Sequence, residues 1–100
     1  MEYIYTITTI KEPKIGAPYG SRCVGWFPTF KQAEKAVVEN QQDIYELGYY
    51  PFCVIEKVGF GIYFLNTEEY WYRWSKDSNK YLKIPIRPRI FNSMACFSLG

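Results

Sequence analysis

The segment EEYWYRWSKDSNKYLKIPIRPR, from Glu68 to Arg89, gathers the side chains of this sequence that are best suited to bind a partner. It holds five large aromatic residues and six Lys or Arg residues. Aromatic rings stack on nucleobases, and guanidinium and ammonium groups pair with phosphates or with the carboxylates of an acidic protein. The segment is therefore the first candidate for a binding surface.

The residues around SKDSN predict a β-hairpin, because Asp, Ser and Asn favour a turn between the strands EYWYRW and KYLKI. Side chains alternate between the faces of a strand, so Tyr70, Tyr72 and Trp74 share one face, and Trp71 and Arg73 share the other. We expect one face to join the core and the other to expose aromatic rings among cations, and which face is exposed stays open. The predicted contact residues are Tyr72, Arg73, Trp74, Lys76, Lys80, Tyr81, Lys83, Arg87 and Arg89. The alternative is an ordinary solvated hairpin whose Lys residues protect a strand edge from aggregation.

Residues suited to catalysis are scarce. The sequence has no histidine, the commonest general base and zinc ligand. Its three cysteines lack CxxC spacing, and Cys53 lies in the apolar run FCVIE, as a buried residue would. Glu68 and Glu69 are adjacent, so on a strand they point to opposite faces and cannot act as a carboxylate pair. We expect no enzymatic activity, no metal site and no cofactor.

The composition favours one small domain, residues 1–100, because single domains are commonly of this size. Hydrophobic residues make up 48% of the chain and aromatic residues 20%, more rings than so small a core is expected to hide. The net charge of +2 is low for a general nucleic-acid binder. The amino-terminal residues lack a basic segment followed by a long apolar one, and no run of residues is apolar enough to span a bilayer. These features predict a soluble, cytoplasmic protein.

Four further segments predict secondary structure. YIYTITTI (Tyr3–Ile10) and SRCVGWF have the composition of two strands, and Gly25 in the second marks a β-bulge or a close backbone approach. PFCVIEKV is apolar on both faces, as expected of a central strand that a helix covers. IYFL, after a turn at Gly59 and Gly61, predicts another strand. The tail after Pro85 is apolar enough to pack back on the domain.

One helix is predicted from Phe30 to Leu47. Thr29 and Gln32 have the spacing of a capping box, apolar residues then recur at helical spacing, and Gly48 supplies a left-handed stop. Asn40 interrupts the apolar stripe, and we expect its side chain to tie down a neighbouring loop, with a ligand contact as the alternative.

The elements together predict an α+β fold, an antiparallel sheet of five or six strands with one α-helix, about residues 30–47, packed on one face. One local alternative concerns residues 67–74. A short helix that begins at Thr67 would place Glu68 and Glu69 in its first turn, where carboxylates favour the helix dipole.

The sequence also resembles a group of short phage- and prophage-encoded proteins of Gram-positive bacteria, over roughly residues 22–83. The shared motifs are F-x-x-A-E at Phe30, Asn and Asp-Ile at the helix end, VIE, GIY, and W-Y-x-W at Trp71. The resemblance implies a small anti-defence protein, similar to anti-CRISPR inhibitors, that blocks a protein of the bacterial host such as a nucleic-acid-binding defence effector.

Three functions follow as hypotheses. The first is a non-catalytic inhibitor that binds a host protein through the aromatic and basic hairpin, with Lys83 and Arg87 as central contacts. The second is a sponge for nucleotides or short nucleic acid, in which aromatic rings stack on bases. The third is a structural module that associates with itself, so a dimer stays open.

Overall fold

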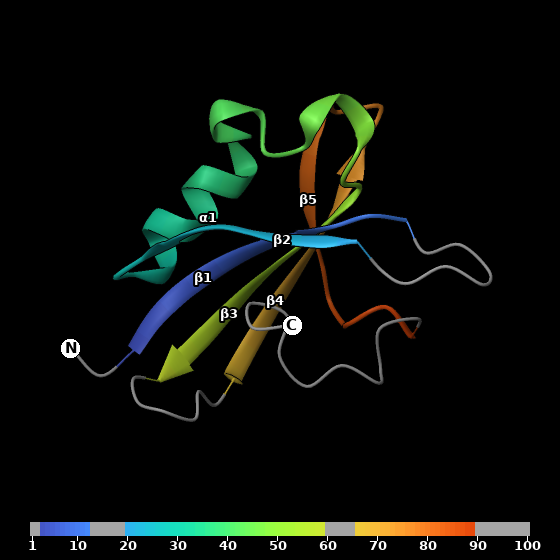
Figure 1. The fold of residues 1–100 in the computed structure, drawn as a ribbon. Coiled ribbons are helices and arrows are strands. Elements are labelled where there is room, and N and C mark those ends of the chain that lie inside the picture. Colours follow the sequence, from blue (N-terminus) through green and yellow to red (C-terminus); the bar gives the residue numbers. More distant parts are fainter. Residues whose placement is uncertain (1–2, 13–19, 60–65, 90–100) are drawn as a thin grey trace.

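The computed structural model describes residues 3–12, 20–59 and 66–89. Their strands form one antiparallel sheet in the order β2-β1-β3-β4-β5, and the helix α1 packs on one face of it (Figure 1). The predicted α+β fold with a five-stranded sheet is therefore confirmed. In chain order the elements are β1 (Tyr3–Ile10), β2 (Ser21–Phe27), α1 (Phe30–Val38), the 3-10 turns η1 (Gln41–Asp43) and η2 (Glu46–Gly48), β3 (Phe52–Gly59), β4 (Asn66–Ser75) and β5 (Lys80–Ile84).

The strands follow the sequence pattern closely. β1 and β2 have the predicted bounds, and β3 occupies the central position of the sheet. The register between β1 and β2 shifts in the middle of the pair. Ile7 pairs with Gly25 but Thr8 pairs with Cys23, which leaves Val24 as the extra residue of a β-bulge. The bulge predicted at Gly25 is thus confirmed.

The last hairpin is also as predicted. Residues 66–75 form a strand, so the alternative of a short helix from Thr67 is wrong. Trp74 pairs with Tyr81 across the turn, and Tyr72 pairs with Lys83. The predicted strand IYFL and the packing of the chain's end lie outside the described residues.

The helix begins where the capping box predicts but ends earlier. The Thr29 hydroxyl accepts a hydrogen bond from the backbone N–H of Gln32 at 3.3 Å, which satisfies one of the first amides of the helix. The helix then ends at Val38 and not at Leu47. The reason is Asn40, whose backbone has φ 48° and lies in the left-handed region, where a right-handed helix cannot continue.

Both faces of the sheet are buried. The face that α1 covers forms the larger core, whose fully or almost fully buried residues are Ile7, Ala33, Ala36, Val37, Cys53, Ile55, Tyr72 and Tyr81. On the opposite face, a second cluster contains Ile10, Phe52, Val54 and Trp71. Burial of apolar side chains on both faces explains why β3 reads as a continuous apolar run. Burial also confirms that Cys53 acts as a small apolar residue, and it raises the pKa of the Cys53 thiol.

Candidate functional site

Two of the predicted contact residues belong to the core. Tyr72 and Tyr81 are fully buried beneath α1, so they do not form part of a binding surface. Their hydroxyls have partners inside the protein: Tyr72 donates to Glu34 Oε2, and Tyr81 donates to the backbone oxygen of Tyr50. The prediction that one hairpin face would expose its rings is wrong, because Trp71 on the opposite face is also buried.

Two predicted cations are engaged within the chain. The Arg87 guanidinium forms a two-pronged ion pair with the Glu69 carboxylate, with Nε 2.7 Å from Oε1, and this hydrogen bond raises the pKa of Arg87. Lys83 Nζ lies 3.9 Å from Glu34 Oε2 and about 5 Å above the ring of Tyr70. Both residues therefore stabilise the fold, and they are weaker candidates for a partner than their sequence position indicates.

Lys83 is nevertheless exposed, as are four other predicted cations, Arg73, Lys76, Lys80 and Arg89. No ion pair involves any of these four among the described residues. Arg73 lies over the ring of Phe52, with 5.3 Å between its guanidinium carbon and the ring centroid. Since Arg73 faces away from α1 while Lys83 faces toward it, the hairpin does not bring all of its cations to one surface.

The structure instead brings Arg73, Trp74 and Lys76 together at a surface hollow of about 570 Å³. Glu12, Tyr45, Leu47, Gly48 and Pro51 complete its lining. A second hollow, of about 450 Å³, is lined by Glu39, Asn40, Asp43, Tyr45, Leu47, Trp74 and Asn79. Tyr45, Leu47 and Trp74 line both hollows and so form a ridge between them, which we call the Leu47 ridge.

In the Leu47 ridge, the stacked rings of Tyr45 and Trp74 form a rigid base and Leu47 is an exposed apolar tip. The Tyr45 ring stacks on the Trp74 indole with centroids 3.7 Å apart, and Tyr81 meets Trp74 edge-on from the core. The Leu47 side chain is 94% exposed, the highest value among the exposed large apolar residues of the described chain. Sequence periodicity misses it, because a helix as far as residue 47 would have placed Leu47 on the buried stripe.

The backbone that carries the ridge is strained. Five residues between 40 and 47 have positive φ although none is glycine: Asn40, Gln42, Asp43, Glu46 and Leu47. Asn and Asp tolerate this conformation, but each of the other three residues costs about 1 kcal/mol, and clusters of such residues occur at functional sites. Leu47 itself has φ 54°. The Leu47 side chain is apolar, is not branched at Cβ and points into solvent. Neither this exposure nor the left-handed backbone stabilises the fold, so both need another explanation.

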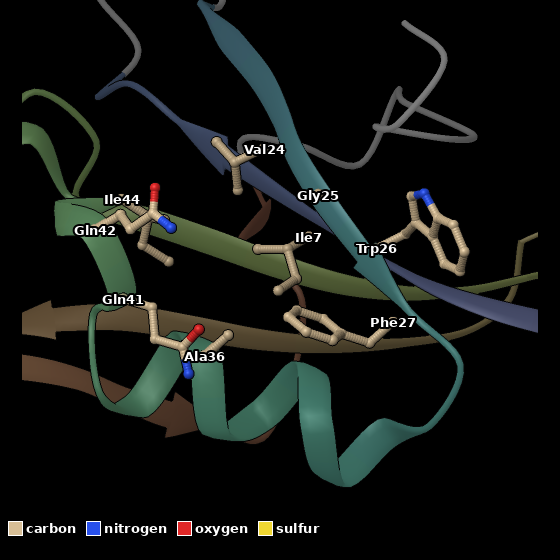
Figure 2. A pocket seen from close by; sticks show the side chains of 9 residues that line it. All are labelled: Ile7, Val24, Gly25, Trp26, Phe27, Ala36, Gln41, Gln42 and Ile44. Atoms are coloured by element: carbon tan, nitrogen blue, oxygen red, sulfur yellow. The ribbon is translucent and has the colours of Figure 1, made fainter.

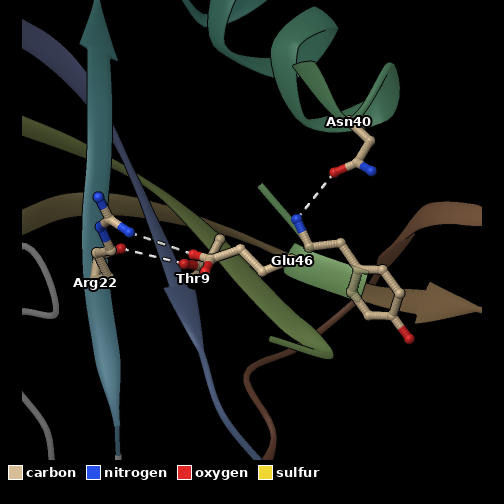
Figure 3. A network of polar contacts seen from close by, with 5 residues as sticks. Thr9, Arg22, Asn40 and Glu46 are labelled. Carbon is tan, nitrogen blue, oxygen red and sulfur yellow. Dashed lines mark hydrogen bonds and ion pairs between the residues drawn. The ribbon is translucent and has the colours of Figure 1, made fainter. Parts of the chain in front are cut away.

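Polar contacts hold this strained segment against the sheet (Figure 3). The Asn40 side-chain oxygen accepts a hydrogen bond from the backbone N–H of Tyr45 at 3.0 Å, so the prediction that Asn40 ties down a loop is confirmed. Arg22 on β2 pairs with Glu46 at 3.4 Å, and the Thr9 hydroxyl donates to the backbone oxygen of Arg22 at 3.3 Å. The segment is thus held at Tyr45 and Glu46, the two residues that precede Leu47.

A third hollow lies between β2 and α1 beside the β-bulge (Figure 2). It has a volume of about 190 Å³, and none of the described residues that line it is charged. The lining residues are Ile7, Val24, Gly25, Trp26, Phe27, Ala36, Gln41, Gln42 and Ile44. Its apolar walls suit one small hydrophobic group, and none of these side chains acts as a general acid or base at neutral pH.

The described residues offer little for nucleotide stacking at the hairpin. Tyr45 already covers one face of Trp74, and Trp71 is buried. Trp26 on β2 is 60% exposed but lies outside the ridge hollows. Within the described chain no group of three His, Cys, Asp or Glu side chains is placed to hold a metal ion, and no helix is long and apolar enough to cross a membrane.

Comparisons with known proteins found no match to a family model, to a curated protein or to a solved structure. The resemblance to phage-encoded proteins therefore stays a prediction from the motifs.

Proposed function

We propose that this protein is a small non-catalytic binding protein that docks on another protein through the Leu47 ridge and blocks it. The observation that carries the proposal is the 94% exposed Leu47 side chain, held on a strained left-handed backbone above the Tyr45–Trp74 stack. Protein interfaces gain most of their energy from a few apolar or aromatic anchors that fill pockets on the partner. A pre-ordered anchor loses little conformational entropy when it binds.

The phage-type motifs supply the class of partner. The proposed target is a defence protein of the bacterial host, and the proposed action is that of an anti-CRISPR-like inhibitor in the host cytoplasm. Blocking by occupancy needs no catalytic group, which agrees with a sequence that has no histidine. The contact residues that this proposal retains from the hairpin are Arg73, Trp74 and Lys76, because Lys80 and Arg89 line neither ridge hollow.

The test is affinity capture from the lysate of a CRISPR-bearing Gram-positive bacterium with wild-type protein and two variants. Leu47→Asp places a charge at the tip of the ridge. Ile86→Asp is the matched control, because Ile86 is also an exposed aliphatic residue, 72% exposed, and lies outside both ridge hollows. Each variant's fold is checked by circular dichroism before capture.

The proposal expects one stoichiometric protein with wild type and with Ile86→Asp, and its loss with Leu47→Asp. A retained nucleotide without a protein partner would replace the proposal with the sponge. A complex formed only between copies of this chain, measured by light scattering, would replace it with the self-associating module.

A further inference from the structure

The two hollows beside the Leu47 ridge differ in charge. The hollow on the hairpin side carries Arg73 and Lys76, and Glu12 is the one acidic residue among the described residues that line it. The hollow on the helix side carries Glu39 and Asp43, and its other polar residues, Asn40 and Asn79, are neutral. The ridge therefore separates a net positive surface from a net negative one.

These charges are largely available to a partner. Lys76 and Glu39 are exposed, and no ion pair involves either of them among the described residues. The Arg73 guanidinium lies over the Phe52 ring, and the Asp43 carboxylate accepts a hydrogen bond from the neutral Asn40 amide at 3.1 Å. Charged groups on the rim of an interface guide encounter and disfavour wrong orientations, since like charges that face each other repel.

We propose that the partner is a protein whose docking surface is an apolar socket with carboxylates on one side and Lys or Arg side chains on the other. Leu47 fills the socket, Arg73 and Lys76 face the carboxylates, and Glu39 and Asp43 face the cations. This arrangement permits one orientation, because a half-turn about the socket would bring like charges together. The inference rests on the proposed function and names the chemistry of its partner.

The same geometry disfavours nucleic acid as the occupant. A nucleic-acid backbone presents negative charge along its whole length, so a strand that crosses the ridge from Lys76 would meet the carboxylates of Glu39 and Asp43. Tyr45 also covers one face of Trp74, so that face is closed to a base. A protein surface supplies charges of both signs within one interface.

The experiment cross-links the two proteins through charged side chains that lie in contact. Wild-type protein is used to capture its partner from the lysate, and the complex is treated with a zero-length carbodiimide, which couples amines to carboxylates in direct contact. Mass spectrometry then locates the links. The expected links run from Lys76 to a partner Asp or Glu, and from Glu39 or Asp43 to a partner Lys, within one complex.

Charge reversal supplies an independent measurement on the same partner. Lys76→Glu and Glu39→Lys are each expected to weaken capture about tenfold, as for charges that face an opposite charge in an interface. Lys31→Glu is the control for Lys76→Glu, because it changes the net charge equally at an exposed helix position outside both hollows.

The outcomes separate this inference from the proposed function. Links from both hollows and about tenfold weaker capture by both reversal variants support it. A partner that is lost with Leu47→Asp but links elsewhere, or that tolerates both reversals, overturns the charge pattern and leaves the proposed function standing. Capture of no protein by wild type overturns both.

Discussion

The Tyr45 ring lies parallel to the Trp74 indole, with 3.7 Å between ring centroids and 8° between ring planes. This contact joins two parts of the chain that the sequence does not relate, the strained segment after α1 and the strand β4. Trp74 is in turn braced by Tyr81 from the core. The position of Leu47, two residues beyond Tyr45, therefore depends on a stack between a loop and the sheet.

The first prediction concerns the strength of that stack. Tyr45→Leu and Trp74→Leu are expected to show a coupling energy of about 1 kcal/mol in a double-mutant cycle, the usual value for an aromatic pair beyond its area burial. Urea denaturation of the four proteins measures it. Additive effects of the two substitutions would mean that the stack does not position the segment.

The second prediction concerns Asn40. Its backbone is left-handed, and its side-chain oxygen accepts a hydrogen bond from the backbone N–H of Tyr45. Asn40→Gly removes this hydrogen bond and the exposed one that the Asn40 amide donates to Asp43, but keeps a residue that tolerates positive φ. It should cost about 1 kcal/mol of unfolding free energy. Asn40→Ala removes both hydrogen bonds and this tolerance, and should cost about 2 kcal/mol. Gln41→Ala, at an exposed neighbour, should stay within about 0.5 kcal/mol of wild type. Equal losses for the Gly and Ala variants would show that backbone strain at residue 40 is negligible.

Asn40 is also the position at which the secondary structure departs from the one that the sequence predicts. The strands were predictable because β-branched and aromatic residues alternate along them, and the helix start was predictable because Thr29 and Gln32 make a recognisable cap. The helix end was not, since Ile44 and Leu47 happen to fit the helical period and Gly48 offers a plausible stop. Asparagine is the non-glycine residue that most readily turns left-handed, and this local preference outweighed the periodicity.

The site was less predictable than the fold for a related reason. Alternation correctly places Tyr72 and Trp71 on opposite faces of β4, but it carries no information on what covers each face. Both residues are buried, and of the predicted contact rings of the hairpin only Trp74 remains a candidate for binding. Leu47 and Tyr45 could not be found at all from the sequence, because their role depends on the early end of the helix.

The third prediction separates strain from binding at Leu47. Because Leu47 has φ 54°, any residue with a Cβ is strained there, whereas glycine is not. Leu47→Gly should therefore be more stable than Leu47→Ala by about 1 kcal/mol in urea denaturation, although both variants lose the anchor and should lose the proposed partner. Equal stability of the two variants would contradict strain at this position. Retained binding by either would contradict its role as an anchor.

The fourth prediction is a loss of stability at alkaline pH, caused by three tyrosines whose pKa the fold raises. The hydrogen bond from the Tyr70 hydroxyl to Glu68 raises the pKa of Tyr70 to about 12. Burial raises the pKa of Tyr72, with its hydrogen bond to Glu34 adding to the shift, and burial likewise raises the pKa of Tyr81. In the unfolded chain these phenols have their ordinary pKa of 10.0.

The direction of this change in stability depends on which state, folded or unfolded, keeps its phenol protons. Above pH 10 the unfolded chain releases phenol protons that the folded protein retains, so raising the pH draws the equilibrium toward the unfolded state. The free energy of unfolding should be level below about pH 9 and fall as the pH rises through 10 to 12, by at most about 1.4 kcal/mol per pH unit for each such tyrosine. Urea midpoints across this range measure it. Tyr72→Phe is the matched variant: it should be less stable than wild type at neutral pH by about 1 kcal/mol and should lose stability less steeply above pH 10. If the variant and the wild type declined in parallel, the Tyr72 hydroxyl would not be among the groups that the fold keeps protonated.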